Sequence, residues 1–232
     1  VGAFSYMSFL AHLSLLILGG RYYSWIKFYK INFVRWLEYA ISSPTMMIVI
    51  ATLSGVQNNH QVSSIFTAAL VTNLFGLMSE ITKESEYKNL SRLFFVLGFL
   101  PFRSSWNPIR KTFKSRFDYL GDGSNDSSFK TDYEKIYGAD KYNQVFGKNF
   151  GIPSWVKYSI DILYFLYYLF PLNMTLQRFI LPKKKKKQIL GIKYQDPYTF
   201  GEKGYVYLSF ISKATLSWIL YAGIDREKES KY

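Results

Sequence analysis

The sequence predicts an all-α transmembrane helix bundle, and three observations lead to this fold class. The chain of 232 residues is 49% hydrophobic and 19% aromatic, and its charges are concentrated between long uncharged runs. Several of these runs approach 20 residues, the length that a helix needs to cross a bilayer. The run from Gly204 to Ile224 is uncharged except for one lysine, Lys213.

The composition excludes several classes of site. The chain has no cysteine, so neither disulfides nor thiolate metal sites are possible, and two histidines are too few for a histidine-rich metal site. The net charge of +13 would suit nucleic acid. Lysines that flank membrane helices explain it better, because they bind anionic lipid and set orientation. We therefore expect membrane lipids, and no nucleic acid, as partners.

A single domain with six membrane-spanning stretches is expected, at about 1–20, 33–56, 62–80, 90–110, 154–177 and 204–224. The fourth stretch is the weak one. Only its segment 93–102 is uncharged, and ten residues are too few to span. The segment 118–152 is polar and rich in Gly, Ser, Asn and Asp, which is typical of a long extramembrane loop.

The charges of the short loops predict the orientation. The basic loops 21–35, 82–92 and 178–203 fall on one side if every stretch spans, and the loop 57–64, without Lys or Arg, falls on the other. By the positive-inside rule the basic loops are cytoplasmic and the C-terminus is extracellular. The run that opens the chain has no basic region before it, unlike a signal peptide. We expect that the N-terminal part of a longer protein is missing.

Lys213 is the first candidate for chemistry. An ammonium inside a membrane costs several kcal/mol unless it is paired, so such a lysine is a functional-site hypothesis by default. Two chemistries fit it: a buried ion pair, or a Schiff base with a carbonyl cofactor, for which retinal is the typical compound in membranes. The candidate anions within the spans are Glu38, Glu80 and Asp161.

Small polar residues accompany these charges at helical spacing. Ser42 follows Glu38 by four residues, and Ser209 precedes Lys213 by four, so each pair shares a helical face. Ser8 and His12 have the same spacing. These groups are able to converge on one buried cluster. Each also has an ordinary explanation: a glutamate near a helix start can snorkel, and intramembrane His and Ser residues commonly serve packing.

Four motifs, in the right order, resemble the heliorhodopsin family. Residues 35–39 (RWLEY), with Ser42 and 46–48 (MMI), resemble the family's third helix, and 73–78 (NLFGLM) with Glu80 resembles the fourth. Residues 173–177 (NMTLQ) are similar to the end of the sixth helix. The family's seventh helix is resembled by residues 201–203 (GEK), Tyr205, 208–209, Lys213 and 216–218 (LSW). Ser8 and His12 fit the family's second helix.

The resemblance implies a bundle of the seven-helix rhodopsin type with a cytoplasmic N-terminus, and hence that the first helix is missing from this chain. It implies all-trans retinal on Lys213 as a Schiff base and Glu38 as its counterion. The implied cofactor site further comprises Ser42, Ser209, Ser8, His12 and Met46. A homodimer is also implied.

The fifth helix departs from the family's pattern. The family's is apolar and borders retinal and the dimer contact, whereas this chain has Arg103, Asn107 and Arg110 there, followed by a long loop. These polar residues keep open the alternative of a polar or water-filled path through the protein, which the family usually lacks.

Two outputs follow from these expectations. In the first, the protein is a light sensor that pumps no ions and signals to a cytoplasmic partner whose identity is unknown. In the second, it is a light-activated proton or cation channel. A third possibility is a membrane protein without photochemistry, in which Lys213 and Glu38 form a structural ion pair. An enzyme is not expected, because no nucleophile–base pair or metal set is visible.

Overall fold

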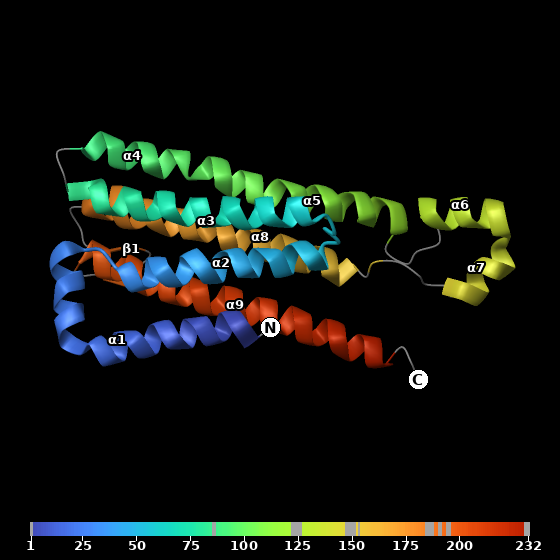
Figure 1. The fold of residues 1–232 in the computed structure, drawn as a ribbon, viewed down its shortest axis with the longest axis horizontal. Helices are drawn as coiled ribbons and strands as arrows, with labels where there is room; N and C mark the ends of the chain where they lie inside the picture. Colours follow the sequence, from blue (N-terminus) through green and yellow to red (C-terminus); the bar gives the residue numbers. More distant parts are fainter. Residues whose placement is uncertain are drawn as a thin grey trace. The chain divides into compact units, whose positions relative to one another are not determined.

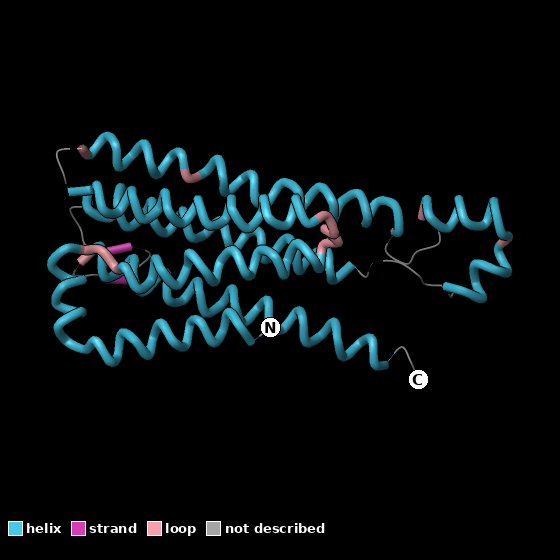
Figure 2. The backbone as a smooth tube through the Cα atoms, in the orientation of Figure 1, coloured by secondary structure: helices cyan, strands magenta, loops and turns pink. Residues whose placement is uncertain are grey.

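The computed structural model describes residues 2–84, 87–121, 127–146, 152, 154–183, 188–189, 192–193 and 196–229. Nearly all of them are helical, which confirms the all-α fold class (Figure 2). The strands described are two residues long, β1 (Gln188–Ile189) and β2 (Ile192–Lys193), and they pair antiparallel. The chain divides into two compact units, Val1–Val34 with Asp161–Tyr232, and Arg35–Ile160. Each unit is described by itself.

The first unit contains α1 (Gly2–Tyr29), which is two helical segments joined at Gly19. Gly19 has φ 61° and ψ −151°, a conformation that glycine adopts without steric cost. The expected basic loop 21–35 is therefore wrong over residues 21–29, which are helical. Rings one turn apart favour the helix there, because Trp25 stacks on Tyr22 at 5.8 Å and contacts Tyr29 at 5.1 Å.

The other long helix of this unit is α9 (Pro197–Glu229), which begins seven residues before the expected span. Asp196 lies just before it and accepts hydrogen bonds from the Thr199 backbone N–H (2.9 Å) and hydroxyl (2.8 Å). Such a side-chain cap followed by proline is a strong helix start. One face of α9 is buried, through Tyr205, Ser209, Lys213 and Leu216, whereas Phe210 and Trp218 are 72% and 71% exposed.

The helix α8 (Ser154–Thr175) continues into a π-helix at Leu176–Ile180 and a 3₁₀ turn at Leu181–Lys183. Its residues from Asp161 onward belong to the first unit. Two glycines of α9 allow a close approach to this segment. A Cβ atom at Gly201 would overlap the Gln177 side chain, and one at Gly204 would overlap that of Asn173.

The second unit contains α2 (Phe33–Leu53), α3 (Asn59–Ile81), a 3₁₀ turn at Thr82–Glu84, α4 (Lys88–Leu97) and α5 (Phe99–Leu120). The helix α3 packs against both α4 and α5, which run along its length (Figure 1). At one end Ser79 and Ser91 exchange hydroxyl-to-carbonyl hydrogen bonds of 2.7 Å. Ile65, Trp106 and Ile109 are buried in the core.

The weak stretch at 90–110 is longer than expected. Gly98 separates α4 from α5 but keeps helical dihedrals (φ −60°, ψ −23°), and its N–H donates to the Phe94 carbonyl at 3.0 Å. The two helices therefore form a nearly continuous rod to Leu120. The rod persists past residue 110 because Phe113 is buried and its ring contacts that of Phe117, with the ring centres 6.0 Å apart.

The expected loop 118–152 is also partly wrong, because it contains α6 (Ser128–Tyr137) and α7 (Ala139–Phe146). The two helices enclose a cluster of rings. Phe129 contacts Phe146 at 5.2 Å, and Tyr133 contacts Tyr142 at 5.9 Å. Tyr142 is only 1% exposed. The polar composition of 118–152 predicted a loop. The aromatic residues of α6 and α7 instead form a small core between the two helices.

Two described helices, α2 and α3, are long and apolar enough to cross a bilayer, with mean hydropathies of 1.2 and 1.5. Core helices of soluble proteins can pass the same test. The other expected spans do not pass it within the described part of the chain.

Candidate functional site

Lys213 lies near the middle of α9 and is 8% exposed. Its Nζ atom donates to two hydroxyl groups, the Oγ of Ser8 at 2.9 Å and the Oγ of Ser209 at 2.9 Å. Ser209 precedes the lysine by one helical turn, while Ser8 comes from α1. The structure thus brings together three residues that the sequence singled out, and two helices far apart in sequence meet at the amine.

His12 lies one turn after Ser8 on α1 and is exposed. Its Nδ1 atom is 2.7 Å from the backbone carbonyl oxygen of Ser8 and donates to it in the tautomer that has its proton on Nδ1. His12 is therefore attached to the same turn as the serine that contacts Lys213. Its contact is with the Ser8 backbone, whereas Lys213 uses the Ser8 hydroxyl.

Glu38, Ser42 and Met46 lie on successive turns along one face of α2. They are 8%, 2% and 3% exposed, respectively. This helix belongs to the second unit, whereas Lys213 and Ser8 belong to the first. A buried carboxylate is tolerated only where charge or hydrogen bonds compensate it, so the burial of Glu38 is unusual for its residue type.

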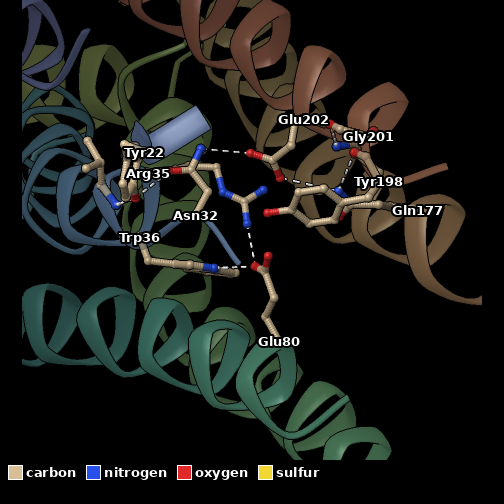
Figure 3. A network of polar contacts seen from close by, with 11 residues as sticks. Tyr22, Asn32, Arg35, Trp36, Glu80, Gln177, Tyr198, Gly201 and Glu202 are labelled. Atoms are coloured by element: carbon tan, nitrogen blue, oxygen red, sulfur yellow. Dashed lines mark hydrogen bonds and ion pairs between the residues drawn. The ribbon is translucent and has the colours of Figure 1, made fainter. Parts of the chain in front are cut away.

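The other two candidate anions have different surroundings. Glu80, at the end of α3, forms an ion pair of 2.5 Å with Arg35 and accepts a hydrogen bond from the Trp36 indole (Figure 3). The Arg35 guanidinium also lies 4.8 Å from the centre of the Trp36 ring. Asp161 is exposed on α8. The sequence placed Arg35 both at the end of the basic loop 21–35 and in the helix motif 35–39, and it did not predict that Arg35 pairs with Glu80.

A second polar network, which sequence reasoning also missed, lies in the first unit around Glu202. This carboxylate accepts from the Asn32 side chain at 2.9 Å and from Gln177 at 3.3 Å (Figure 3). Gln177 also donates to the Tyr198 carbonyl at 2.9 Å. The Tyr22 hydroxyl donates to Asn32 at 3.3 Å. The network joins the end of α1, the π-helix after α8 and the start of α9, and it borders a cavity of about 230 Å³.

The first unit contains the residue types that suit a carbonyl cofactor. A primary amine is the group that forms a Schiff base with an aldehyde. A polyene also needs apolar walls, and the same unit buries such side chains on α8 and α9, namely Leu163, Leu166, Tyr167, Tyr205 and Leu216. In contrast, no group of three or more His, Cys, Asp or Glu residues that could bind a metal occurs in the part of the chain that the structure describes.

Comparison with known proteins agrees with this chemistry. The family model for heliorhodopsin matches residues 1–118 and 142–224, which leaves out α6 and the end of α5. No curated protein matches the chain. Heliorhodopsins are membrane-embedded, retinal-binding, light-sensing proteins rather than typical enzymes. Because the match covers most of its length, the chain is a member of the heliorhodopsin family.

Proposed function

We propose that the protein is a light sensor in which all-trans retinal is bound to the Nζ atom of Lys213 as a protonated Schiff base, with Glu38 as counterion. The observation that supports it best is the amine itself, 8% exposed and within 2.9 Å of the Ser8 and Ser209 hydroxyls. A lysine without a functional role is rarely retained in such a position.

The choice of Glu38 is supported by the state of the other two anions. Glu80 forms an ion pair with Arg35 and accepts a hydrogen bond from Trp36, and Asp161 is exposed. Glu38 is the buried carboxylate on a face with Ser42 and Met46. A positive charge in a low-dielectric site needs an anion beside it, and Glu38 is the carboxylate that we assign to this role.

Bound retinal would supply the absorption of visible light and a photoisomerisation next to the Lys213 nitrogen. The residues of this chain do the rest. Ser8 and Ser209 would offer hydrogen-bond acceptors to the single N–H of the bound nitrogen, Glu38 and Ser42 would balance its charge, and Met46 would line the cofactor site. His12, bonded to the Ser8 backbone, would receive a proton that leaves the nitrogen, because a neutral imidazole has a ring nitrogen that can accept one.

The sensor is favoured over the channel by the direction of the polar residues in α5. Arg103, Asn107 and Arg110 were the local support for a conducting path, and all three are exposed, while Trp106 and Ile109 of the same helix are buried. A path through the protein would need polar side chains that point inward.

The sensor would act through a cytoplasmic partner. We also propose that the protein assembles as a homodimer.

The proposed orientation keeps the basic loops on the cytoplasmic side and the C-terminus outside. Within the first unit, the hydrogen bond between Asn32 and Glu202 supports a common side for the loops 21–35 and 178–203. Protease or cysteine-labelling accessibility from each side of a sealed vesicle measures this orientation.

The test of the function is spectroscopic. The membrane-inserted chain is mixed with all-trans retinal, and we expect a visible absorption band that the Lys213→Ala variant lacks. Lys203→Ala is the matched control, because Lys203 is an exposed lysine of the same helix. Glu38→Gln should move the band to longer wavelength, since it removes the negative charge beside the chromophore.

Two other results would contradict the proposal. A wild-type chain that forms no band with retinal would support a structural ion pair without photochemistry. A light-evoked current in voltage-clamped cells would support the channel instead of the sensor.

A further inference from the structure

The helix α5 has a polar stripe on its outward face. Arg103, Asn107, Arg110 and Lys114 follow one another at spacings of four, three and four residues, which aligns them on one side of a helix. All four are exposed. A neighbouring side of the helix, about a quarter turn away, is buried through Phe102, Trp106, Ile109 and Phe113. Because α5 packs on α3 by its buried side, the stripe faces the surroundings of the unit.

The rod formed by α4 and α5 sets the depth of the stripe in a bilayer. Arg92 near its start and Arg110 are both exposed, and the rise of 1.5 Å per residue separates them by about 27 Å. This is close to the hydrocarbon thickness of about 30 Å, so the two arginines can reach opposite headgroup layers. Arg103 then lies about 10 Å inside Arg110 along the helix, and its long side chain can reach back toward the headgroups.

An apolar band precedes the stripe on the same side of the rod. Leu93, Val96 and Leu100 are 50%, 61% and 66% exposed, and the helical dihedrals of Gly98 keep them in phase with Arg103. The outward face is therefore apolar in the middle of the membrane and cationic toward the end of α5. An anionic phospholipid is complementary to this face, because its acyl chain would lie against the apolar band and its phosphate against the cationic residues.

We propose that this face binds an anionic phospholipid in the leaflet where α5 leaves the membrane. Arg103 and Arg110 bind its phosphate, since guanidinium groups pair with phosphate oxygens in bidentate geometry. An acyl chain lies along Leu93, Val96 and Leu100. The acid on this side, Asp118, comes one turn beyond Lys114 and so lies farther from the hydrocarbon.

A second copy of the chain suits this face less well. Dimers of identical subunits most commonly use a twofold axis, which sets the same patch of both copies against each other. Two stripes of arginine and lysine would then oppose one another, and like charges across an interface are unfavourable. The basic stripe therefore argues for lipid at the position where the family resemblance predicted an apolar dimer contact.

The absence of cysteine from the sequence permits a site-specific test. A fluorophore is attached to Ser104→Cys, an exposed position next to Arg103, in the full chain reconstituted in phosphatidylcholine vesicles. Quenching is compared between doxyl-labelled phosphatidylglycerol and doxyl-labelled phosphatidylcholine at equal mole fraction. We expect quenching by phosphatidylglycerol to exceed quenching by phosphatidylcholine severalfold. Each arginine near the surface should contribute roughly a fivefold preference.

The variant Arg103→Gln/Arg110→Gln should bring the quenching ratio at Ser104→Cys close to one. Two controls are matched to it. Lys135→Gln/Lys141→Gln removes the same charge from α6 and α7 and should leave the ratio unchanged. A label at Ser64→Cys, exposed near the start of α3 and without Lys or Arg nearby in sequence, should show a ratio near one in every protein.

Three results would overturn the proposal: a wild-type ratio near one at Ser104→Cys, a ratio that the double variant does not change, or weak quenching by both lipids, as expected if a second copy covers the face. Helicity measured by circular dichroism checks the fold of each variant. If the double variant does not fold, Arg110→Gln alone is used, and a loss of preference of roughly fivefold is expected. None of these readouts depends on retinal, so they fail or succeed separately from the light-sensor proposal.

Discussion

The Nη2 atom of Arg35 lies 2.5 Å from the Oε2 atom of Glu80, and this ion pair joins the start of α2 to the end of α3. The side chains are 7% and 3% exposed. The Trp36 indole donates to the same carboxylate, and its ring lies so close to Gly76 that no Cβ atom would fit there. Since Glu38 is one turn along α2 from Arg35, the pair holds the helix that presents the proposed counterion.

Removal of one member of this pair should be far more harmful than removal of both. Glu80→Ala leaves the Arg35 charge buried without its carboxylate, and we expect a loss of about 3–5 kcal/mol in unfolding free energy. Arg35→Met/Glu80→Leu replaces both charges with apolar side chains and should cost much less. Denaturant unfolding in detergent micelles measures the difference. A cost below about 1 kcal/mol for Glu80→Ala would mean that the ion pair does not stabilise the unit.

The two hydroxyls at Lys213 should both affect the chromophore. A hydrogen bond to a charged group contributes roughly 1.5–3 kcal/mol, so Ser8→Ala and Ser209→Ala should each shift the visible band and lower the temperature at which it bleaches. Ser159→Ala is the control, because its hydroxyl donates to the Trp155 carbonyl. Spectra and thermal bleaching of the retinal-bound protein provide the measurement. Unchanged spectra in both variants would contradict the assigned role of the serines.

Glycine at position 201 should be intolerant of even one methyl group. Gly201→Ala drives a Cβ atom into the Gln177 side chain, which its bonds to Tyr198 and Glu202 hold in place. Overpacking of this kind costs about 1–3 kcal/mol. Gly20→Ala is the matched control, because nothing lies within 4 Å of its added Cβ atom, and it should stabilise the helix by up to about 1 kcal/mol. Thermal unfolding followed by circular dichroism should show opposite signs for the two changes.

The start of α9 should weaken in acid. Partial burial raises the pKa of Asp196, but hydrogen bonds from the Thr199 backbone and hydroxyl, together with the charge of Lys30, outweigh it and lower the pKa below its usual 3.8. A lowered pKa in the folded state means that the carboxylate stabilises the fold above pH 3.8, and that this stabilisation is lost as the pH falls through the folded value.

Asp196→Asn separates charge from capping in this prediction. Asparagine keeps the hydrogen-bond acceptor but does not titrate, so the acid-dependent loss should disappear while the helix start is retained. Asp196→Ala should cost about 0.5–2 kcal/mol at neutral pH. Hydrogen exchange of the first turn of α9 between pH 3 and pH 7 is the measurement. An equal pH dependence in the wild type and the asparagine variant would assign the effect to another group.

The limits of prediction are seen at particular helix ends. The apolar run from Gly204 located the body of α9, but the true start at Pro197 depends on the Asp196 cap, which hydropathy does not detect. The basic residues after Gly20 suggested a loop, although a stack of rings continues α1 to Tyr29. In 118–152, the polar composition concealed the aromatic cluster that folds α6 onto α7.

The sequence by itself determined the helical class, the family motifs and the turn that sets Ser209 beside Lys213, because these depend on residues close together along the chain. Only the tertiary structure decided that Ser8 meets the same amine, that Glu80 pairs with Arg35, and that Arg103 and Arg110 face outward. Periodicity shows which residues share a helical face. The partner of that face is decided by how helices distant in sequence pack to bury their apolar sides and satisfy their charges.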